Sequence, residues 1–430
     1  MNRAATTAEP RMKGRIQDLA LLGGPPAFDE PLHVGRPNIG DRQALQRRID
    51  ELLDRNWLTN DGPFVREFEQ RIADMVGVRH CVAMTNATIA LEIAIRALGM
   101  TGEVIVPAFT FVATAHALQW QEITPVFCDI DPLTHTIDPS RAAELITPKT
   151  SGILGVHLWG GPADVGALTA LAGKHDLALL FDAAHAFGCS YMGTPVGRFG
   201  SAEVFSFHAT KFLNSFEGGA VVTDDDDLAS RLKLMRNFGF SGYDRVIYVG
   251  TNGKMTEIAA AMGITSLEAM DSIVSVNRRN YERYRTRLAG VPGIRMLPVD
   301  DRGRSNYQYV VLEIAAEEAQ LSRDRLLQVL WAENVLARRY FYPAVHRMEP
   351  YRSHFPHASL VLPETERICG RVMTLPTGSA VDDASVDLIT SVIRVALSGA
   401  DEIERRVPAP TDEFLNQPPP KALPVHTRRT

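Results

Sequence analysis

The stretch "FSFHATKFLNSFEGGAVVTDD" (Phe205–Asp225) places a single lysine, Lys211, between two apolar runs. Each run, "AEVFSF" before the lysine and "GGAVVT" after it, has the length and the residue types of a short strand. No helical pattern separates them, so we expect a strand, a loop that carries Lys211, and a second strand. A loop lysine is either a surface charge or an amine held in a pocket for chemistry, and the rest of the chain decides between the two.

Short apolar runs alternate with helical patterns over the preceding 130 or so residues. The strand-like runs are "HCVAMT", "EVIVP", "TPVFCDID", "SGILGVHL" and "LALLFDAAH", and helical patterns such as "TIALEIAIRALGM" lie between them. Strands that are apolar throughout, joined by helices, are typical of a mainly parallel sheet that is covered on both faces. The predicted fold class is therefore α/β.

The length of 430 residues exceeds that of a usual single-core domain, and the pattern changes along the chain. We predict an N-terminal arm (1–38), a large α/β domain (39–255) and a linking helical region (256–290). A small α+β domain (291–400) follows, with strands at "NYQYVVLEI" and "LARRYFY", and the chain ends in a proline-rich tail (401–430).

Composition and charge exclude several classes of protein. The net charge is -6, and no basic tract indicates a nucleic-acid partner. No apolar stretch has the length of a membrane span, and the N-terminus lacks a signal-peptide pattern. Four cysteines without a CxxC pair favour a reducing compartment, hence the cytoplasm, and disfavour a metal site or disulfides.

Ligands of open parallel sheets bind at the carboxyl ends of the strands, which selects two strand-to-helix turns. At the first, Thr85–Thr88, free N–H groups at a helix start favour a phosphate, although Asn86 or Thr88 could simply cap the helix. At the second, Phe111 either packs in the core or offers a flat face to a planar cofactor.

Asp182 ends the apolar run "LALLF", where a buried carboxylate needs a partner. It could cap a turn, bind a metal together with His185, or pair with a cationic ring nitrogen. A phosphate turn, an aromatic residue, a strand-end aspartate and a loop lysine follow one another in that order. Together they match the needs of pyridoxal 5'-phosphate (PLP): donors for the phosphate, a stacking face, an acid beside the pyridine nitrogen, and an amine for the aldehyde.

The chain resembles the DegT/DnrJ/EryC1/StrS family of sugar aminotransferases, which are fold type I PLP enzymes. The resemblance spans about residues 35–398. It is carried, in family order, by "NATIALEIAIRALG", "VPAFTFVATAHAL", "GVHLWGGPADV", "FDAAHAFG", "FSFHATKFLNSFEGGAVVT", "NGKMTEIAAAMG" and "RRYFYPAVHRMEPY".

The resemblance implies a role for each matching residue. Lys211 matches the lysine that bonds to PLP, Asp182 the partner of the pyridine nitrogen, and Phe111 the stacking aromatic. His185 matches a residue near the phenolic oxygen of PLP. The phosphate cradle is matched by Ala87, Thr88 and Ser206, and by Asn252, which reaches it from the second subunit of a homodimer. The small-residue "SGT" of the family's phosphate turn is here Asn86-Ala87-Thr88, which leaves the role of Asn86 open.

The resemblance also implies the reaction. The amino donor is expected to be L-glutamate, which leaves as 2-oxoglutarate, and the acceptor a nucleotide-linked keto sugar in deoxysugar biosynthesis, for antibiotics or surface polysaccharides. His208 favours amination at carbon 4 of dTDP-4-keto-6-deoxyglucose, because relatives that act on carbon 3 more often carry Tyr-Pro at His208-Ala209. Arg338 and Arg339 are candidates to meet the diphosphate, or are simply exposed.

Three other functions are weighed against this one. A PLP-dependent sugar dehydratase of this family carries histidine in place of Lys211. A cysteine desulfurase needs a mobile nucleophilic cysteine, and none of the four lies in a suitable loop motif. A non-enzymatic ligand sensor needs an attached DNA-binding module, and the first 35 or so residues show no helix-turn-helix pattern.

Overall fold

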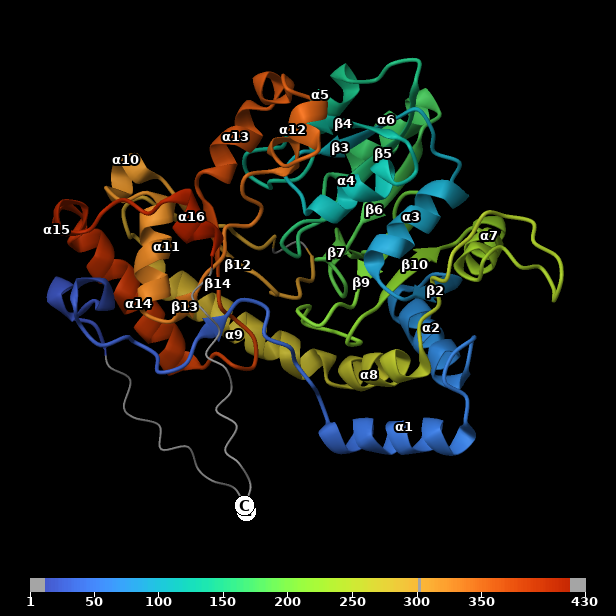
Figure 1. The fold of residues 1–430 in the computed structure, drawn as a ribbon, viewed down its shortest axis with the longest axis horizontal. Helices are drawn as coiled ribbons and strands as arrows, with labels where there is room; N and C mark the ends of the chain where they lie inside the picture. The colour runs from blue at the N-terminus through green and yellow to red at the C-terminus, as the bar shows by residue number, and fades with distance from the viewer. Residues whose placement is uncertain (1–11, 301–302, 418–430) are drawn as a thin grey trace.

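The computed structural model describes residues 12–300 and 303–417 and contains one large sheet (Figure 1). Its seven strands follow the order β2-β10-β9-β6-β5-β3-β4. All neighbours pair in parallel except β10, which runs antiparallel to both β2 and β9. The strands are β2 (His80–Met84), β3 (Glu103–Pro107), β4 (Thr124–Cys128), β5 (Thr150–Val156), β6 (Ala178–Asp182), β9 (Ala202–Ser206) and β10 (Gly219–Thr223). The predicted α/β class is confirmed.

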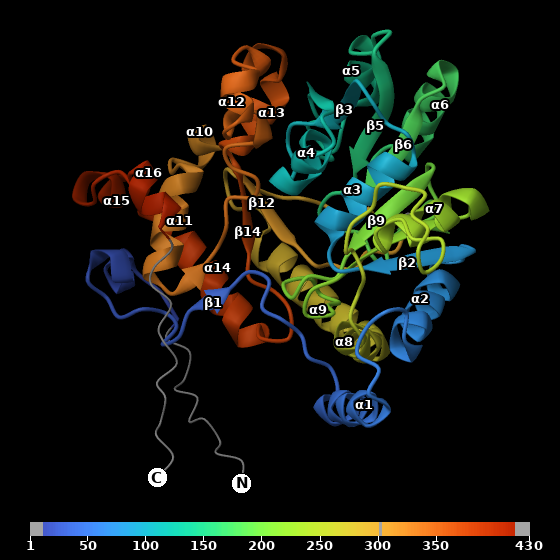
Figure 2. The same ribbon diagram turned by 45° about the vertical axis from the view of Figure 1, so that its right-hand side comes forward.

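Helices cover both faces of this sheet because its strands are apolar on both sides. Along β6, Leu180 packs with one core, while Leu179 and Phe181 pack with another. The first face carries α3 (Ala87–Ala97), α4 (Val112–Gln119) and α7 (Asp226–Arg236). The opposite face carries α2 (Pro63–Val76), α5 (Pro139–Glu144), α6 (Val165–His175) and α8 (Glu257–Glu268). Figure 2 shows β9 and β2 between α3 and α2.

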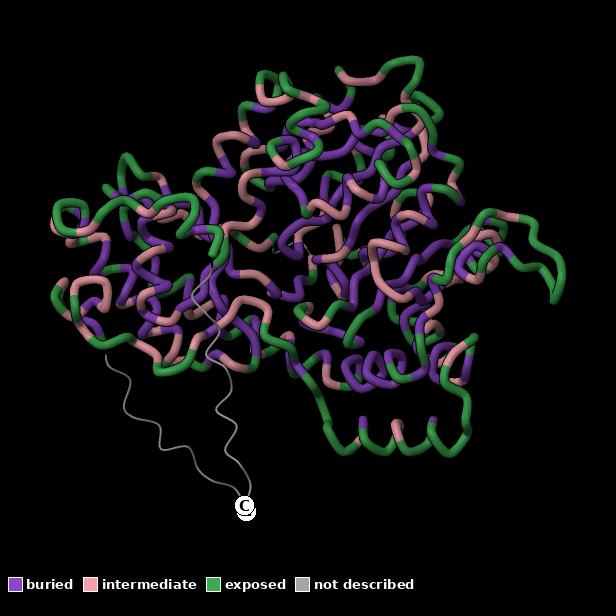
Figure 3. Tube along the Cα trace, in the orientation of Figure 1, coloured by how far each residue is buried: buried purple, intermediate pink, exposed green. Residues whose placement is uncertain are grey.

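The predicted linking region consists of two helices. The first, α8, ends at Glu268, and α9 (Met270–Leu288) leaves it at an angle of 60°. The helix α8 is buried against the large sheet. The helix α1 (Arg42–Arg55) packs along the outer side of α8 (Figures 1 and 3). Among the described residues no single helix is long and apolar enough to cross a membrane, and only the bent pair α8 and α9 reaches that length together.

The segment from Val291 onward forms a second, smaller sheet with its own hydrophobic core. Its strands are β11 (Ile294–Met296), β12 (Val310–Ile314) and β14 (Val372–Leu375), all antiparallel. The helices are α10 (Ala316–Ala319), α11 (Arg323–Ala332), α12 (Tyr351–His354), α13 (Pro363–Cys369) and α14 (Asp383–Ser398). The helices α11 and α14 share the core of this sheet with α9. The predicted boundaries of the large domain (39–255) and the small domain (291–400) remain a proposal, and α12 packs through Tyr351 in a core of the large sheet.

Three smaller differences separate the structure from the sequence prediction. The expected strand at "LARRYFY" is only β13 (Val335–Leu336), because the chain turns where the N–H of Tyr342 bonds to the carbonyl of Arg339 at 2.7 Å. The predicted arm contributes β1 (Leu32–His33), which pairs with β13. The predicted tail contains α15 (Ala400–Arg406) and α16 (Asp412–Asn416), and residues 418–430 lie outside the described part.

Candidate active site

A cavity of about 380 Å³ opens at the edge where the parallel strands end. The ends of β2, β3, β5, β6 and β9 all reach this edge, and β10 begins there because it runs the other way. Seven of the eight predicted site residues line the cavity: Ala87, Thr88, Phe111, Asp182, His185, Ser206 and Lys211. The structure therefore brings together side chains that are up to 124 positions apart in the sequence, as for Ala87 and Lys211.

Lys211 lies on the loop between β9 and β10, as predicted, and its side chain is half-buried in the cavity wall. The loop is held tightly: the N–H of Lys211 bonds to the carbonyl of His208 at 2.9 Å, and the amide of Asn38 donates to the carbonyl of Phe212 at 3.1 Å. Burial lowers the pKa of Lys211 to about 8, although the charge of Asp182 raises it in part. The amine is thus held at the cavity with a lowered pKa, unlike the amine of a surface lysine.

Asp182 is the last residue of β6 and is buried at the floor of the cavity. Its Oδ2 accepts a hydrogen bond from the Thr114 hydroxyl at 2.9 Å, and its Oδ1 accepts one from the Ala184 N–H at 3.1 Å. Burial raises the pKa of this carboxyl, and these two donors and Lys211 oppose the rise. Among the described residues no cluster of His, Cys, Asp and Glu is arranged to hold a metal ion.

Phe111 is not a core residue, because 56% of it is exposed where it lines the cavity. It is the N-cap residue of α4, and a neighbouring ring, Phe341, lies 6.3 Å away. This arrangement leaves a flat aromatic face open to a planar ligand.

The helix α3 begins at the cavity, and its first turn provides unpaired N–H groups. Asn86 caps the helix by accepting from the N–H of Ile89 at 2.9 Å, which is the capping alternative considered from the sequence. Gly219 of β10 crosses so close that a Cβ atom there would lie 2.5 Å from the nitrogen of Ala87. A glycine is needed at this crossing for steric reasons, and the helix start, together with Thr88 and Ser206, forms a concave site suited to an anion.

Other residues at the site depend on three-dimensional placement and were not predicted. Thr114 lies on α4 one turn after Thr110, with 2.9 Å between the two hydroxyl oxygens. Tyr309, the residue directly before β12, bonds to His185 at 3.0 Å and lies 3.5 Å from the amine of Lys211. The pair of threonines at i and i+4 was the only sequence signal for Thr114, and nothing near Tyr309 in sequence pointed to the site.

Asn252 and Arg339 do not line the cavity, whereas Arg338 does. Asn252 is exposed and is not among the residues that line the cavity; it pairs with Asn237 near the base of a projecting loop. Arg338 is exposed and lines both this cavity and a second one of about 420 Å³ beside it. Arg339 instead packs over the Tyr342 ring at 4.1 Å and donates to the carbonyl of Leu415 at 3.2 Å.

Comparison with known proteins agrees with this geometry. Residues 40–394 match the model of the DegT/DnrJ/EryC1/StrS aminotransferase family. The dTDP-4-amino-4,6-dideoxy-D-glucose transaminase of Escherichia coli is 34% identical over 368 residues, which cover 85% of this chain and 98% of that protein. The GDP-perosamine synthase of Caulobacter vibrioides is 34% identical over 348 residues, 80% of this chain and 92% of that protein. The crystal structure of DesI in the presence of its TDP-sugar product is 51% identical, with a TM-score of 0.87, and covers 91% of this chain and 99% of that one.

The fold and the site define a PLP-dependent aminotransferase of fold type I. More narrowly, the chain belongs to the DegT/DnrJ/EryC1/StrS aminotransferase family, and the family and cofactor predicted from the sequence are confirmed. The residues present fit PLP: the helix start suits its phosphate, the face of Phe111 its ring, and Asp182 its pyridine nitrogen. His185 Nδ1, buried and without a hydrogen-bond partner among the described residues, is a further polar atom that a bound ligand can satisfy.

Proposed function

We propose that this enzyme transfers the amino group of L-glutamate to carbon 4 of dTDP-4-keto-6-deoxyglucose. The observation that carries the proposal is the convergence of Lys211, Asp182 and Phe111 on one cavity beside the start of α3. PLP, when bound, supplies an electron sink for the electrons released at the donor's α-carbon. The remaining chemistry belongs to side chains of the chain itself.

Lys211 is the residue proposed to bond to the cofactor and, once freed by the donor amine, to move the proton of the donor's α-carbon. A general base works best when its pKa lies near the working pH, and burial brings the pKa of Lys211 to about 8. We propose that the charged form of Asp182 pairs with the ring nitrogen of the bound cofactor and keeps it protonated, although burial raises the pKa of this carboxyl. Thr114 and the Ala184 N–H stabilise that charge.

The choice of carbon 4 rests on the relatives and on His208. The Escherichia coli relative is named for a 4-amino sugar. His208 lines the cavity next to Lys211, with its Nδ1 2.8 Å from the Thr210 hydroxyl and its Nε2 3.4 Å from Glu217. We place the sugar in this part of the cavity and the diphosphate toward Arg338, whose guanidinium is the exposed cation between the two cavities.

The test is to incubate the enzyme with PLP, L-glutamate and dTDP-4-keto-6-deoxyglucose, and to locate the new C–N bond by NMR of the product. The account predicts nitrogen at carbon 4. Nitrogen at carbon 3 with a dTDP-3-keto sugar, and none with the 4-keto sugar, would instead support the alternative of a carbon 3 aminotransferase. Lys211 argues against a dehydratase, and a sensor without turnover would leave both sugars unchanged.

We also propose a homodimer whose two sites are shared, with Asn252 serving the site of the second subunit. The loop that follows α7 (residues 238–249) projects from the molecule (Figure 1), and Asn252 pairs with Asn237 directly before it. Six of its apolar side chains are exposed, namely Phe238, Phe240, Tyr243, Val246, Ile247 and Val249. Exposed apolar side chains gathered on one projection favour contact with another protein surface, here a second copy of the chain.

All four cysteines are buried and unpaired, which supports the proposed cytoplasmic location.

Mixing two inactive variants tests the shared site. Lys211→Ala removes the amine, and Asn252→Ala removes the group given to the other subunit. In a random mixture about half of the dimers combine both chains, and each such dimer has one site with both residues intact. The expected activity is about a quarter of the wild-type value, which is far above that of either variant alone. A mixture no more active than its components, after exchange of subunits has been confirmed, would contradict the proposal.

A further inference from the structure

The hydroxyl of Tyr309 lies between two groups of the active site. Its oxygen is 3.5 Å from Lys211 Nζ and 3.0 Å from His185 Nε2. The Tyr309 ring packs against two neighbouring rings, edge-on to Trp159 with centroids 5.5 Å apart and tilted against His185 at 4.4 Å. The hydroxyl is thus fixed by packing of its ring at a point where it meets both side chains.

Donor and acceptor chemistry determines which atom carries each proton. Burial lowers the pKa of His185 well below its usual range, so the imidazole is neutral and bears one proton. Burial raises the pKa of Tyr309 well above its usual range, so its hydroxyl keeps its proton. An ammonium at Lys211 can only donate, so it donates to the Tyr309 oxygen, and the phenolic proton is left for His185 Nε2. The ring proton of His185 must then sit on Nδ1.

His185 Nδ1 is the atom that has no partner within the described residues, although it is buried. A buried N–H without an acceptor is costly, and it indicates that a ligand oxygen completes the hydrogen bond. We propose that Tyr309 is a positioning residue: it holds His185 in the Nδ1–H form, ready to donate to an oxygen of the bound cofactor, and it holds the amine of Lys211 in the cavity whenever that amine is free. The inference rests on the cofactor site assigned above and not on the identity of the sugar.

The direct test is the tautomer of His185 in the full chain after PLP has been removed. Nitrogen-15 labelling of the 12 histidines gives ring shifts that separate the two tautomers, and the signal missing in His185→Gln identifies His185. The account predicts the Nδ1–H form in the wild-type protein at neutral pH. A wild-type His185 in the Nε2–H form, or one that carries both protons, would overturn the inference without any variant of Tyr309.

A variant pair adds a functional readout. Tyr309→Phe keeps the ring packing and removes the hydroxyl, so we expect mixed tautomers at His185 and a kcat lower by about ten-fold, with the KM for L-glutamate nearly unchanged. Tyr284→Phe is the matched control, because that buried hydroxyl donates to the Pro376 carbonyl at 3.0 Å, away from the site. A Tyr309→Phe protein with wild-type His185 shifts and wild-type kcat would contradict the proposal. A wild-type protein that binds no PLP would overturn the cofactor site and the inference together, whereas inactivity toward one keto sugar leaves the NMR result standing.

Discussion

At the scale of single residues, Asp182 shows how hydrogen bonds favour the charged form of a buried carboxyl group. A carboxylate with no partner at the end of a buried strand would take up a proton, and burial does raise its pKa. The Thr114 hydroxyl and the Ala184 N–H oppose this by bonding to the charged form. Thr114 is therefore expected to matter for cofactor binding although it does not face the reacting atoms.

Replacing Thr114 with valine preserves shape and removes the hydroxyl. A hydrogen bond to a charged group contributes about 1.5–3 kcal/mol, so PLP affinity should fall by about ten-fold or more. Because the lost bond lowered the pKa of Asp182, that pKa should rise further, and the loss of PLP affinity on acidification should begin at a higher pH. Titration of the PLP absorbance against protein concentration at several pH values measures both effects.

Thr390→Val is the control for that experiment. The Thr390 hydroxyl is buried and bonds only within its own helix α14, to the carbonyl of Val386 at 2.9 Å and that of Asp387 at 3.0 Å. Its removal should leave PLP affinity unchanged. Equal losses in both variants would show that Thr114 acts through general stability and not through Asp182.

At the scale of elements, the positions of many strands and loops could be predicted from the sequence, but the contacts between elements could not. The apolar run that ends at Asp182 and the strand–loop–strand around Lys211 depend on local patterns, and the structure has both. The expected strand at "LARRYFY" failed because the chain turns between Arg339 and Tyr342, and its residues line a cavity instead of pairing in a sheet. Tyr309 lies 98 positions from Lys211, so only the packing of β12 against the large sheet brings it to the site.

The crossing of β10 over the start of α3 makes a prediction about Gly219. A Cβ atom there would lie 2.5 Å from the nitrogen of Ala87, so alanine should push the strand and the helix apart. We expect Gly219→Ala to lower the free energy of unfolding by about 1–3 kcal/mol and to weaken PLP binding at the helix start. Denaturant unfolding and PLP titration measure the two effects.

Gly173→Ala serves as the control for the crossing. Gly173 lies in α6, and a Cβ atom there would meet no atom within 4 Å. Alanine should therefore stabilise the helix by about 0.5–1 kcal/mol and leave PLP binding unchanged. A Gly219→Ala protein that is as stable as this control and binds PLP as well would contradict the steric requirement for glycine at position 219.

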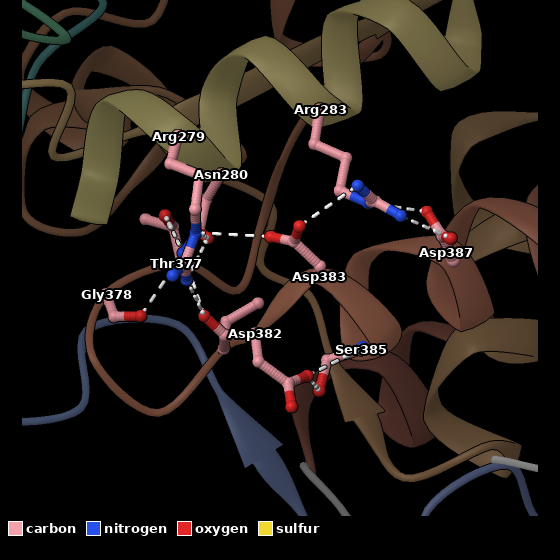
Figure 4. A network of polar contacts seen from close by, with 10 residues as sticks. Arg279, Asn280, Arg283, Thr377, Gly378, Asp382, Asp383, Ser385 and Asp387 are labelled. Atoms are coloured by element: carbon pink, nitrogen blue, oxygen red, sulfur yellow. Dashed lines mark hydrogen bonds and ion pairs between the residues drawn. The ribbon is translucent and has the colours of Figure 1, made fainter. Parts of the chain in front are cut away.

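At the scale of the whole molecule, α9 links the large sheet to the small one through a network of ion pairs with α14 (Figure 4). Arg283 and Arg287 each make two hydrogen bonds to the carboxylate of Asp387, at 2.6–2.8 Å. Nearby, the Asn280 amide donates to the carbonyls of Gly378 and Val381, at 3.2 and 3.1 Å. The loop after β14 is thereby fixed to α9, and Ser379 in that loop reaches Asn38, which holds the loop of Lys211.

This network predicts a pH-dependent contribution to stability. The hydrogen bonds from Arg283, followed by those from Arg287, lower the pKa of Asp387, so the contribution is complete above the ordinary aspartate pKa of about 3.9 and is lost as the pH falls through the lower folded-state pKa. Asp387→Asn should cost about 1 kcal/mol of unfolding free energy at pH 7, and the difference from wild type should vanish in strong acid. Glu144→Gln, which breaks an exposed pair with Arg141, should change little at either pH. A difference for Asp387→Asn that stays constant from pH 7 down to pH 3 would contradict the argument.

The central claim, that Lys211 is the amine of a sugar aminotransferase, is tested most directly by the visible spectrum of the protein with PLP. The account predicts an absorbance band of lysine-bound PLP, its loss on addition of L-glutamate, and its return on addition of dTDP-4-keto-6-deoxyglucose. In Lys211→Ala, PLP should bind weakly and L-glutamate should produce no turnover. A wild-type protein without the band, or a Lys211→Ala protein with full activity, would contradict the claim.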